Sequence, residues 1–265
     1  MKKLLLSLFV AGWTLSAFCQ ITETRVVSGF TGIDASSAFN ITVTKGNTES
    51  LTVEADDNIM PYVRTEVKQG VLHLYLDNNK KVKNVKTLKA IVVMKNLDKV
   101  MLSGACKLTG NGLFTPDKFK SDCSGATQLD LQLNTGQMTI ETSGASKINL
   151  HAEVAGDVKI DVSGASKMNM ELKAANVRFN SSGSSKVEIV GSASDIYVDL
   201  SGASNVNAGD FSVNSATVKS SGSCNISLNV SGTLDVNSSG ASSIRYKGAP
   251  AINANTSGAS KIRKI

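Results

Sequence analysis

Lysine and asparagine side chains recur at one position of a repeated segment, where they could form an extended binding face. Each lies four residues after the first serine of a four-residue signature, which reads Ser-Gly-Ala-Ser in five of its nine copies. In chain order the position holds Lys107, Gln128, Lys147, Lys167, Lys186, Asn205, Asn225, Ser243 and Lys261. Strand alternation directs this position outward. We therefore predict a candidate binding face that consists of Lys107, Lys147, Lys167, Lys186, Asn205, Asn225 and Lys261.

Three of these lysines, Lys147, Lys167 and Lys186, belong to consecutive repeats. If neighbouring repeats pair as strands, the backbones at these positions lie roughly 5 Å apart. Two unit charges at that separation repel by about 0.8 kcal/mol in water, and by less in salt. Because the cost is this small, a solubilising surface explains the row without any ligand. Both interpretations stay open at this level.

A second row, two residues before the signature serine, is acidic. It contains Asp122, Glu141, Asp161, Asn180 and Asp199. These side chains could offset the lysine charges or attract a cation. However, the chain lacks the glycine- and aspartate-rich nonapeptide of calcium-binding β-rolls, and no six oxygen ligands converge on one point. We therefore predict no metal site and no cofactor.

The signature serines could suggest nucleophilic catalysis, but nine equivalent serines cannot each be a nucleophile. No Gly-x-Ser-x-Gly elbow occurs, and the only imidazole bases, His73 and His151, stand in no special motif. Asp161 with Lys167 could mimic the acid–base pair of a polysaccharide-active β-helix enzyme, yet the same pairing recurs as ordinary repeat chemistry. The sequence predicts no catalytic residues.

The repeat itself indicates how these side chains are positioned. The signature begins at Ser103, Ser124, Ser143, Ser163, Ser182, Ser201, Ser221, Ser239 and Ser257, with spacings of 21, 19, 20, 19, 19, 20, 18 and 18 residues. The positions three residues before and five residues after each serine are almost wholly apolar, and polar residues alternate with them. This period of two is typical of strands with one buried face.

Two short strands therefore meet at each signature, where a glycine permits the chain to bend. The repeat glycines are Gly104, Gly125, Gly144, Gly164, Gly183, Gly202, Gly222, Gly240 and Gly258. The remaining residues of a repeat, such as 151–157, are expected to form a shorter third side and the return turn. A unit of this size has no room for a crossover helix, so identical units must stack in parallel.

The predicted fold is all-β: a single-stranded right-handed parallel β-helix, or solenoid, with coils of about 19 residues. The hand follows the general hand of β-crossovers. Residues 101–265 form the regular repeat, and residues 21–100 are strand-like but irregular. We interpret residues 21–100 as the first coils and the end cap of the same continuous domain.

Residues 1–20 are typical of a signal peptide, because Lys2 and Lys3 precede a short apolar run at residues 4–11. Removing the two lysines leaves 26 basic and 22 acidic residues, a net charge of +4. This mild excess lacks the clustered basic patch of a nucleic-acid-binding protein. No later segment is long and apolar enough for a transmembrane helix. The sequence predicts an exported protein, in the periplasm, at the outer-membrane surface or outside the cell.

Four cysteines leave further questions open. Cleavage near Cys19 or Gln20 raises the possibility of a lipid anchor, although Phe18 is not the small residue that a lipobox requires before its cysteine. Export permits disulfides, but three remaining cysteines, Cys106, Cys123 and Cys224, leave at least one thiol free. We interpret them as small buried fillers, and whether Cys106 and Cys123 pair stays open.

The beginning of the irregular part carries a family resemblance. The pattern Arg25-Val-Val-Ser-Gly29-Phe30-Thr-Gly-Ile33, followed by Phe39-Asn-Ile41-Thr-Val43, resembles the start of the head GIN domain family. That family is labelled "putative auto-transporter adhesin" and is a domain of unknown function. The serial signature coils resemble its body, so the likeness extends over residues 21–265. The resemblance implies an exported bacterial β-helix.

Three functions remain open from the sequence. The first is a non-catalytic cell-envelope or extracellular binding module of the adhesion type, whose strand face contacts a glycan or an envelope protein. The second is a structural spacer or assembly element without a specific ligand. The third is a polysaccharide-active enzyme, which converging carboxylates in a cleft would favour.

Overall fold

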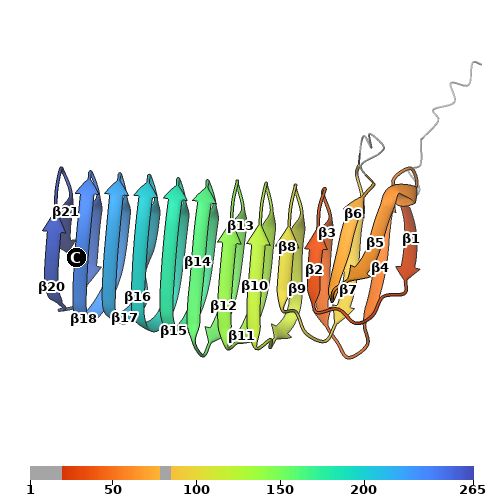
Figure 1. The fold of residues 1–265 in the computed structure, drawn as a ribbon, viewed down its shortest axis with the longest axis horizontal. Helices are drawn as coiled ribbons and strands as arrows, with labels where there is room; N and C mark the ends of the chain where they lie inside the picture. Colours follow the sequence, from red (N-terminus) through yellow and green to blue (C-terminus); the bar gives the residue numbers. More distant parts are fainter. Residues whose placement is uncertain (1–19, 78–84) are drawn as a thin grey trace, which may run out of the picture.

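The protein forms an elongated solenoid of β-strands (Figure 1). The computed structural model describes residues 20–77 and 85–265, so the predicted signal segment lies outside the described residues except for Gln20. Along the described chain, coils of about 19 residues stack for about nine turns, as the sequence predicts. The other regular element described is a single 3-10 turn, η1 (Met60–Tyr62).

Strands β1 to β7 make up the irregular N-terminal part. They are β1 (Gln20–Arg25), β2 (Gly32–Ala35), β3 (Asn40–Lys45), β4 (Ser50–Asp56), β5 (Val63–Lys68), β6 (Val71–Leu76) and β7 (Leu88–Met94).

Strands β8 to β21 make up the repeat. The shorter ones are β8 (Lys99–Leu102), β9 (Lys107–Phe114), β10 (Lys118–Cys123), β11 (Gln128–Thr135), β12 (Gln137–Thr142), β13 (Lys147–Val154), β14 (Asp157–Gly164), β19 (Ser243–Lys247), β20 (Ala251–Thr256) and β21 (Lys261–Lys264). Four long strands run through a return bend into the next signature: β15 (Lys167–Gly183), β16 (Lys186–Gly202), β17 (Asn205–Gly222) and β18 (Asn225–Gly240).

Each coil contributes one strand to each of two sheets. The strands before each signature form what we call the leading sheet: β8, β10, β12, β14, the second halves of β15 to β18, and β20. The strands after each signature form the following sheet: β9, β11, β13, the first halves of β15 to β18, β19 and β21. All of these strands pair in parallel with their copies one coil away, so equivalent residues of successive repeats lie side by side.

The core lies between the two sheets and follows the predicted alternation. Ile160 of the leading sheet pairs in register with Ile140 and Phe179, and all three are buried. Ile148 of the following sheet likewise lies between Leu129 and Met168. Both inward columns are buried except at Ala254 and Ile262 of the last coil, and the buried Ser121 is their one polar member. The predicted inward positions are confirmed.

The shorter third side that the sequence predicts at residues 151–157 is wrong for this coil. Residues 151–154 continue β13, in which Ala152 and Val154 are buried like Ile148 and Leu150 before them. Only residues 155–156 make the return turn before β14 begins at Asp157. The small side chains of Ala155 and Gly156 permit a tight return, so two strands complete the coil.

The signature glycines hold the corners in a conformation that other residues rarely adopt. All nine have φ between +72° and +126°. A Cβ atom at any of them would lie 2.4 to 2.7 Å from a backbone carbonyl oxygen of the coil before it. The coils therefore meet backbone to backbone at this corner, and only glycine satisfies both the φ angle and the spacing. In the coil formed by β2 and β3, Ser37 occupies the position equivalent to the signature glycine, with φ +79°.

Small hydroxyl side chains fill the interior beneath these corners. The hydroxyl oxygens of Ser181 and Ser185 lie 2.7 Å apart, and the Ser185 hydroxyl donates to the hydroxyl oxygen of Ser204 in the next coil at 3.2 Å. Because these buried hydroxyls bond to one another, they avoid the cost of unpaired polar groups.

The cysteines at these corner positions, Cys106, Cys123 and Cys224, are buried and free, as predicted for fillers. Burial raises the pKa of Cys106 to about 11 and that of Cys123 to about 12, so both stay as thiols.

The N-terminal strands do not stack in chain order. Strand β2 lies between β6 and β8, and β3 lies between β7 and β9, all in parallel. The coil formed by β6 and β7 is therefore farther from the repeat than the coil formed by β2 and β3. Antiparallel pairs extend this end: β4 pairs with β7, β1 with β4, and β5 with β6. These antiparallel pairings have no counterpart in the sequence prediction.

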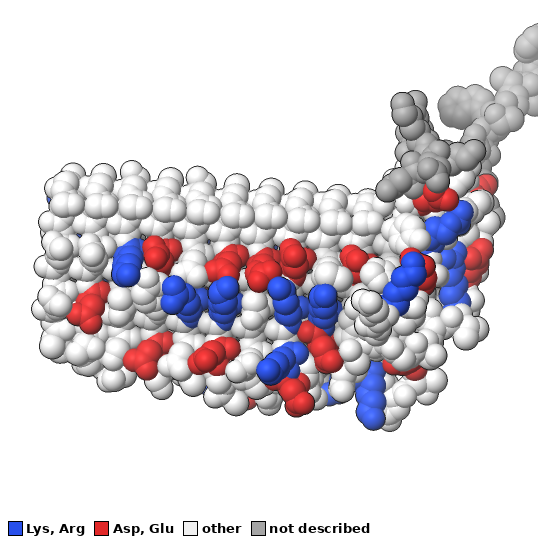
Figure 2. All heavy atoms as spheres, viewed as in Figure 1, with Lys and Arg blue, Asp and Glu red and all other residues white. Residues whose placement is uncertain are grey.

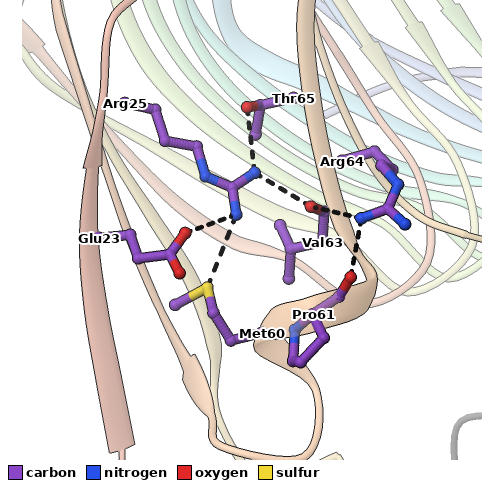
Figure 3. Close-up of polar contacts among 7 residues, drawn as sticks. All are labelled: Glu23, Arg25, Met60, Pro61, Val63, Arg64 and Thr65. Atoms are coloured by element: carbon purple, nitrogen blue, oxygen red, sulfur yellow. Dashed lines mark hydrogen bonds and ion pairs between the residues drawn. The ribbon is translucent and has the colours of Figure 1, made fainter.

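Arg25 joins the outermost strands of the two sheets (Figure 3). Its guanidinium extends from the end of β1 and donates to the carbonyl oxygen of Val63 at 3.0 Å and to Oγ1 of Thr65 at 3.1 Å on β5. The same group forms an ion pair with Glu23 at 2.9 Å. One planar side chain with several donors thus closes this end of the solenoid.

Asp56, at the end of β4, is a buried carboxylate that anchors the chain entering β7. It accepts hydrogen bonds from the backbone N–H groups of Lys86 at 2.7 Å and Thr87 at 3.1 Å. These two bonds hold the pKa of Asp56 below its ordinary value, although burial works in the opposite direction.

A carboxylate in the core should prevent folding of the central coils. We expect Ile160→Asp to destabilise the protein by about 3 kcal/mol or more, because an unpaired buried charge has no compensating partner. Lys118→Asp, at an exposed position of the same sheet, should change stability little. Urea unfolding followed by circular dichroism measures both, and equal midpoints for Ile160→Asp and the parent would refute the inward assignment.

A side chain at a signature glycine should be far more damaging than one at its neighbour. Gly164→Val should cost at least about 2 kcal/mol, because its φ is +89° and its Cβ would lie 2.6 Å from the Gly144 carbonyl oxygen. Ala165→Ser should be nearly neutral, since serine occupies that position in two other coils. Thermal unfolding compares the two variants, and similar losses would mean that the corner does not depend on glycine.

Acid should remove the stabilisation that Asp56 provides. Its pKa is lower in the folded protein than in the unfolded chain, so its contribution is complete above the unfolded pKa of about 4 and is lost as pH falls through the folded pKa. Asp56→Asn should therefore be less stable than the parent at neutral pH, and the difference should shrink below pH ~3. Urea midpoints across this range test it; a difference that does not depend on pH contradicts the assignment.

Candidate binding faces

The predicted lysine and asparagine residues lie in one straight column on the following sheet, which we call the lysine column. Strand register places them side by side in the order Lys107, Gln128, Lys147, Lys167, Lys186, Asn205, Asn225, Ser243 and Lys261. All are exposed except Ser243, which is half-buried. Asn40 and Lys89 continue the column toward the N-terminal end. No signature precedes these two residues, so the repeat pattern in the sequence did not indicate them.

Most lysines of this column form no ion pair within the described residues, although the charge of Lys167 also acts on nearby Glu188. Lys186 forms an ion pair with Glu188 at 3.1 Å, and hydrogen bonding from that ammonium lowers the pKa of Glu188. In the described part of the chain, Lys107, Lys147, Lys167 and Lys261 form no ion pair. Lys147 and Lys167 are also direct neighbours across the β13–β15 pairing. They form the most concentrated positive charge of the column.

An amide ladder runs beside the lysine column, two residues further along each strand. Asn169 donates to the Asn149 side-chain oxygen at 2.9 Å, and Asn149 donates to Asp130 at 3.5 Å. The side-chain oxygen of Asn169 is buried without a hydrogen-bond partner. This ladder borders a shallow groove of about 390 Å³, whose other side includes His151 and Glu171. The face thus combines cations with hydrogen-bonding amides.

The leading sheet carries two charged rows of opposite sign (Figure 2). The acidic row, predicted from the sequence, contains Asp122, Glu141, Asp161 and Asp199, in register with Asn180. A basic row beside it, two residues earlier on each strand, contains Lys99, Lys120, Lys159 and Arg178. Lys120 pairs with Glu141 at 3.0 Å, and Lys159 pairs with Asp161 at 2.7 Å.

These pairs revise the role suggested for the acidic row. Glu141 and Asp161 are compensated within their own sheet. From the sequence alone, the acidic row could either offset the lysine column or attract a cation. Partial burial of Asp161 opposes ionisation, but hydrogen bonds from Asn180 and Lys159 outweigh it and lower its pKa. The basic row was missed because its position also holds threonine and tyrosine, so it shows no repeated residue type.

One part of the basic row includes an aromatic ring. Arg178 lies over the ring of Tyr197, with its guanidinium carbon 4.4 Å from the ring centroid, and the Lys219 nitrogen lies 5.6 Å from the same centroid. The Tyr197 hydroxyl donates to Asp199 at 3.2 Å. Arg178 and Tyr197 line a groove of about 560 Å³ on the leading sheet. Tyr197, an aromatic residue at an outward position, was the one sequence signal that could have indicated this groove.

The histidines and the signature serines form no recognisable catalytic arrangement. His73 contacts Asp34 at 3.0 Å, and His151 contacts Glu171 at 2.9 Å, each on an exposed or half-buried strand surface. Among residues 20–77 and 85–265, no three His, Cys, Asp or Glu side chains cluster closely enough to hold a metal ion. Within the same residues, no helix has the length and apolar character needed to cross a membrane.

The repeat coils, their straight outward columns and the capped N-terminal end define a β-solenoid protein with extended strand faces. Family comparison is more specific. The family described as "Putative auto-transporter adhesin, head GIN domain" matches residues 29–155 and again residues 151–250. The chain therefore belongs to the head GIN domain family, in agreement with the resemblance seen in the sequence.

Solved structures share the fold over nearly the whole chain. A "putative adhesin" from Parabacteroides merdae is 19% identical, with a TM-score of 0.70 over 93% of this chain and 96% of that one. A "putative adhesin" from Parabacteroides distasonis is also 19% identical, with a TM-score of 0.68 over 94% and 98%. A "Putative lipid binding protein" from Parabacteroides distasonis is 18% identical, with a TM-score of 0.71 over 93% and 96%. Comparison with curated proteins found no match.

Proposed function

We propose that this chain is an exported, non-catalytic module of the adhesion type, which binds an acidic glycan through the lysine column. The adhesin description of its family and of its structural neighbours supports the adhesion-type role. The signal-like residues 1–20 support export to the cell envelope or beyond it.

The single observation that carries the choice of face is that Lys147 and Lys167 form no ion pair within the described residues. These ammonium groups are exposed neighbours without ion pairs, whereas Lys120 and Lys159 of the leading sheet are neutralised by carboxylates. Neighbouring like charges that form no ion pair attract an anionic partner and orient its approach. The amide ladder beside the column adds hydrogen-bonding groups that suit sugar hydroxyls.

The geometry of the column favours a linear ligand that lies along the solenoid axis. Successive coils are separated by about 4.8 Å, which is close to the length of one sugar in an extended glycan chain. A polymer with one carboxylate per sugar could therefore place one anion beside each coil. Each contact is weak because it is exposed, so affinity should rise with the length of the polymer and fall with salt.

Removing two neighbouring lysines should weaken this binding. At low salt, Lys147→Gln/Lys167→Gln should reduce the affinity for polygalacturonate by up to about tenfold, since each exposed contact contributes up to about 1 kcal/mol. The matched control is Lys99→Gln/Lys118→Gln, which removes the same charge from the leading sheet, where these lysines also form no ion pair. Biolayer interferometry with immobilised polymer at low and high salt measures the difference.

The control decides between a site and a general charge effect. If both double variants lose affinity equally, net charge alone explains the binding and the lysine column is not the site. If the parent fails to bind the polymer even at low salt, the acidic-glycan function is wrong.

A further inference from the structure

We infer that the groove beside Tyr197 on the leading sheet is a second binding site, which takes a short acidic oligosaccharide. It is separate from the lysine column, because the two lie on different sheets of the solenoid. The inference does not require the lysine column to bind anything.

The shape of the groove suits a short linear ligand. It extends along β12, β14, β15, β16 and β17, each of which contributes two outward side chains from equivalent positions. Five neighbouring strands span about 19 Å at the usual strand spacing. The volume of about 560 Å³ lies within the range of small-molecule sites. A ligand of about four sugars therefore fits its length.

The positive charge in this groove is held in place before any ligand arrives. Arg178 stacks on one ring whose hydroxyl is fixed by Asp199, and Lys219 approaches the same ring. In the described residues neither cation forms an ion pair, unlike Lys159 on the neighbouring strand. A guanidinium that stacks through its face keeps its N–H edges free to bind a carboxylate bidentately. The arrangement therefore selects a carboxylate at this point.

The other polar groups of the groove favour hydroxyl-rich ligands and disfavour densely charged ones. Asn176 donates to Asp157 at 2.8 Å, and Asp195 lies next to Asn176 in register on the adjacent strand. Carboxylates accept hydrogen bonds from sugar hydroxyls, whereas they repel closely spaced phosphates. A nucleic acid or a polyphosphate would therefore meet repulsion here, and an oligosaccharide with isolated carboxylates would not.

The ring edge and the backbone between these side chains provide the remaining contact. Sugars present apolar C–H faces as well as hydroxyls, and an aromatic residue that is half-buried supplies apolar area without ordering cost. Binding here should depend on shape, so it should be less sensitive to salt than binding at the lysine column.

Calorimetry with aldotetraouronic acid, a tetrasaccharide of three xyloses and one 4-O-methylglucuronate that carries a single carboxylate, tests the site on the full chain. Arg178→Gln and Tyr197→Ala should each reduce the affinity for the tetramer by about tenfold or more. The first variant loses the bidentate contact with the carboxylate, and the second loses the ring that positions Arg178. Tyr197→Phe keeps the ring and should retain affinity within about threefold, as the lost hydroxyl contributes only one modest hydrogen bond. Arg245→Gln removes one exposed charge from the following sheet and should change nothing.

Four outcomes would overturn the inference. The first is failure of the parent to bind the tetramer at millimolar concentration. The second is equal affinity for the neutral tetramer xylotetraose, which would contradict selection of a carboxylate. The third is an unchanged affinity in Arg178→Gln or Tyr197→Ala. Lys147→Gln/Lys167→Gln separates the two sites: it should leave tetramer binding intact even if it abolishes polymer binding, and loss of tetramer binding in this variant would place the ligand on the other sheet.

Discussion

The contact between backbones at the signature corners is the constraint on which the rest of this solenoid depends. At each corner a glycine with positive φ lies so close to the preceding coil that no Cβ atom fits between them. The residue after each glycine donates its N–H across the same gap, as Ala126 does to Gly104 at 2.8 Å. This contact fixes both the spacing of the coils and their register, because a shift of one residue would place a side chain in the gap.

Fixed register converts a spacing in the sequence into a straight column on a surface. A single exposed lysine has little binding energy, but Lys147, Lys167 and their neighbours recur at one spacing along one line. On the leading sheet the same repetition sets opposite charges beside one another, so that Lys159 and Asp161 neutralise each other. Within the described residues the two faces therefore differ in their ion pairs, because Lys120 and Lys159 have carboxylate partners whereas Lys147 and Lys167 form no ion pair.

The sequence was sufficient to predict the architecture and the lysine column, because both depend on residues that recur at each repeat. It was insufficient where the repeat is absent or the residue type varies. The order of β2 and β3 relative to β6 and β7 depends on long-range pairing that no local pattern records. The stacking of Arg178 on Tyr197 depends on two unlike residues from adjacent coils. Ion pairs such as Lys120–Glu141 also depend on side-chain reach between coils, which alternation alone does not reveal.

The insertion of β2 and β3 between later strands has a consequence for a chain that emerges from the ribosome in order, N-terminus first. These two strands appear early, yet their neighbours on both sides, β6 with β7 and β8 with β9, appear afterwards. β2 and β3 therefore have neighbours on both sides only after the chain has emerged through β9, and these contacts have high sequence separation. Every later coil finds a finished edge to pair with and needs only about one repeat of new chain. Assembly should thus change from one slow, cooperative step to rapid templated growth in a single direction.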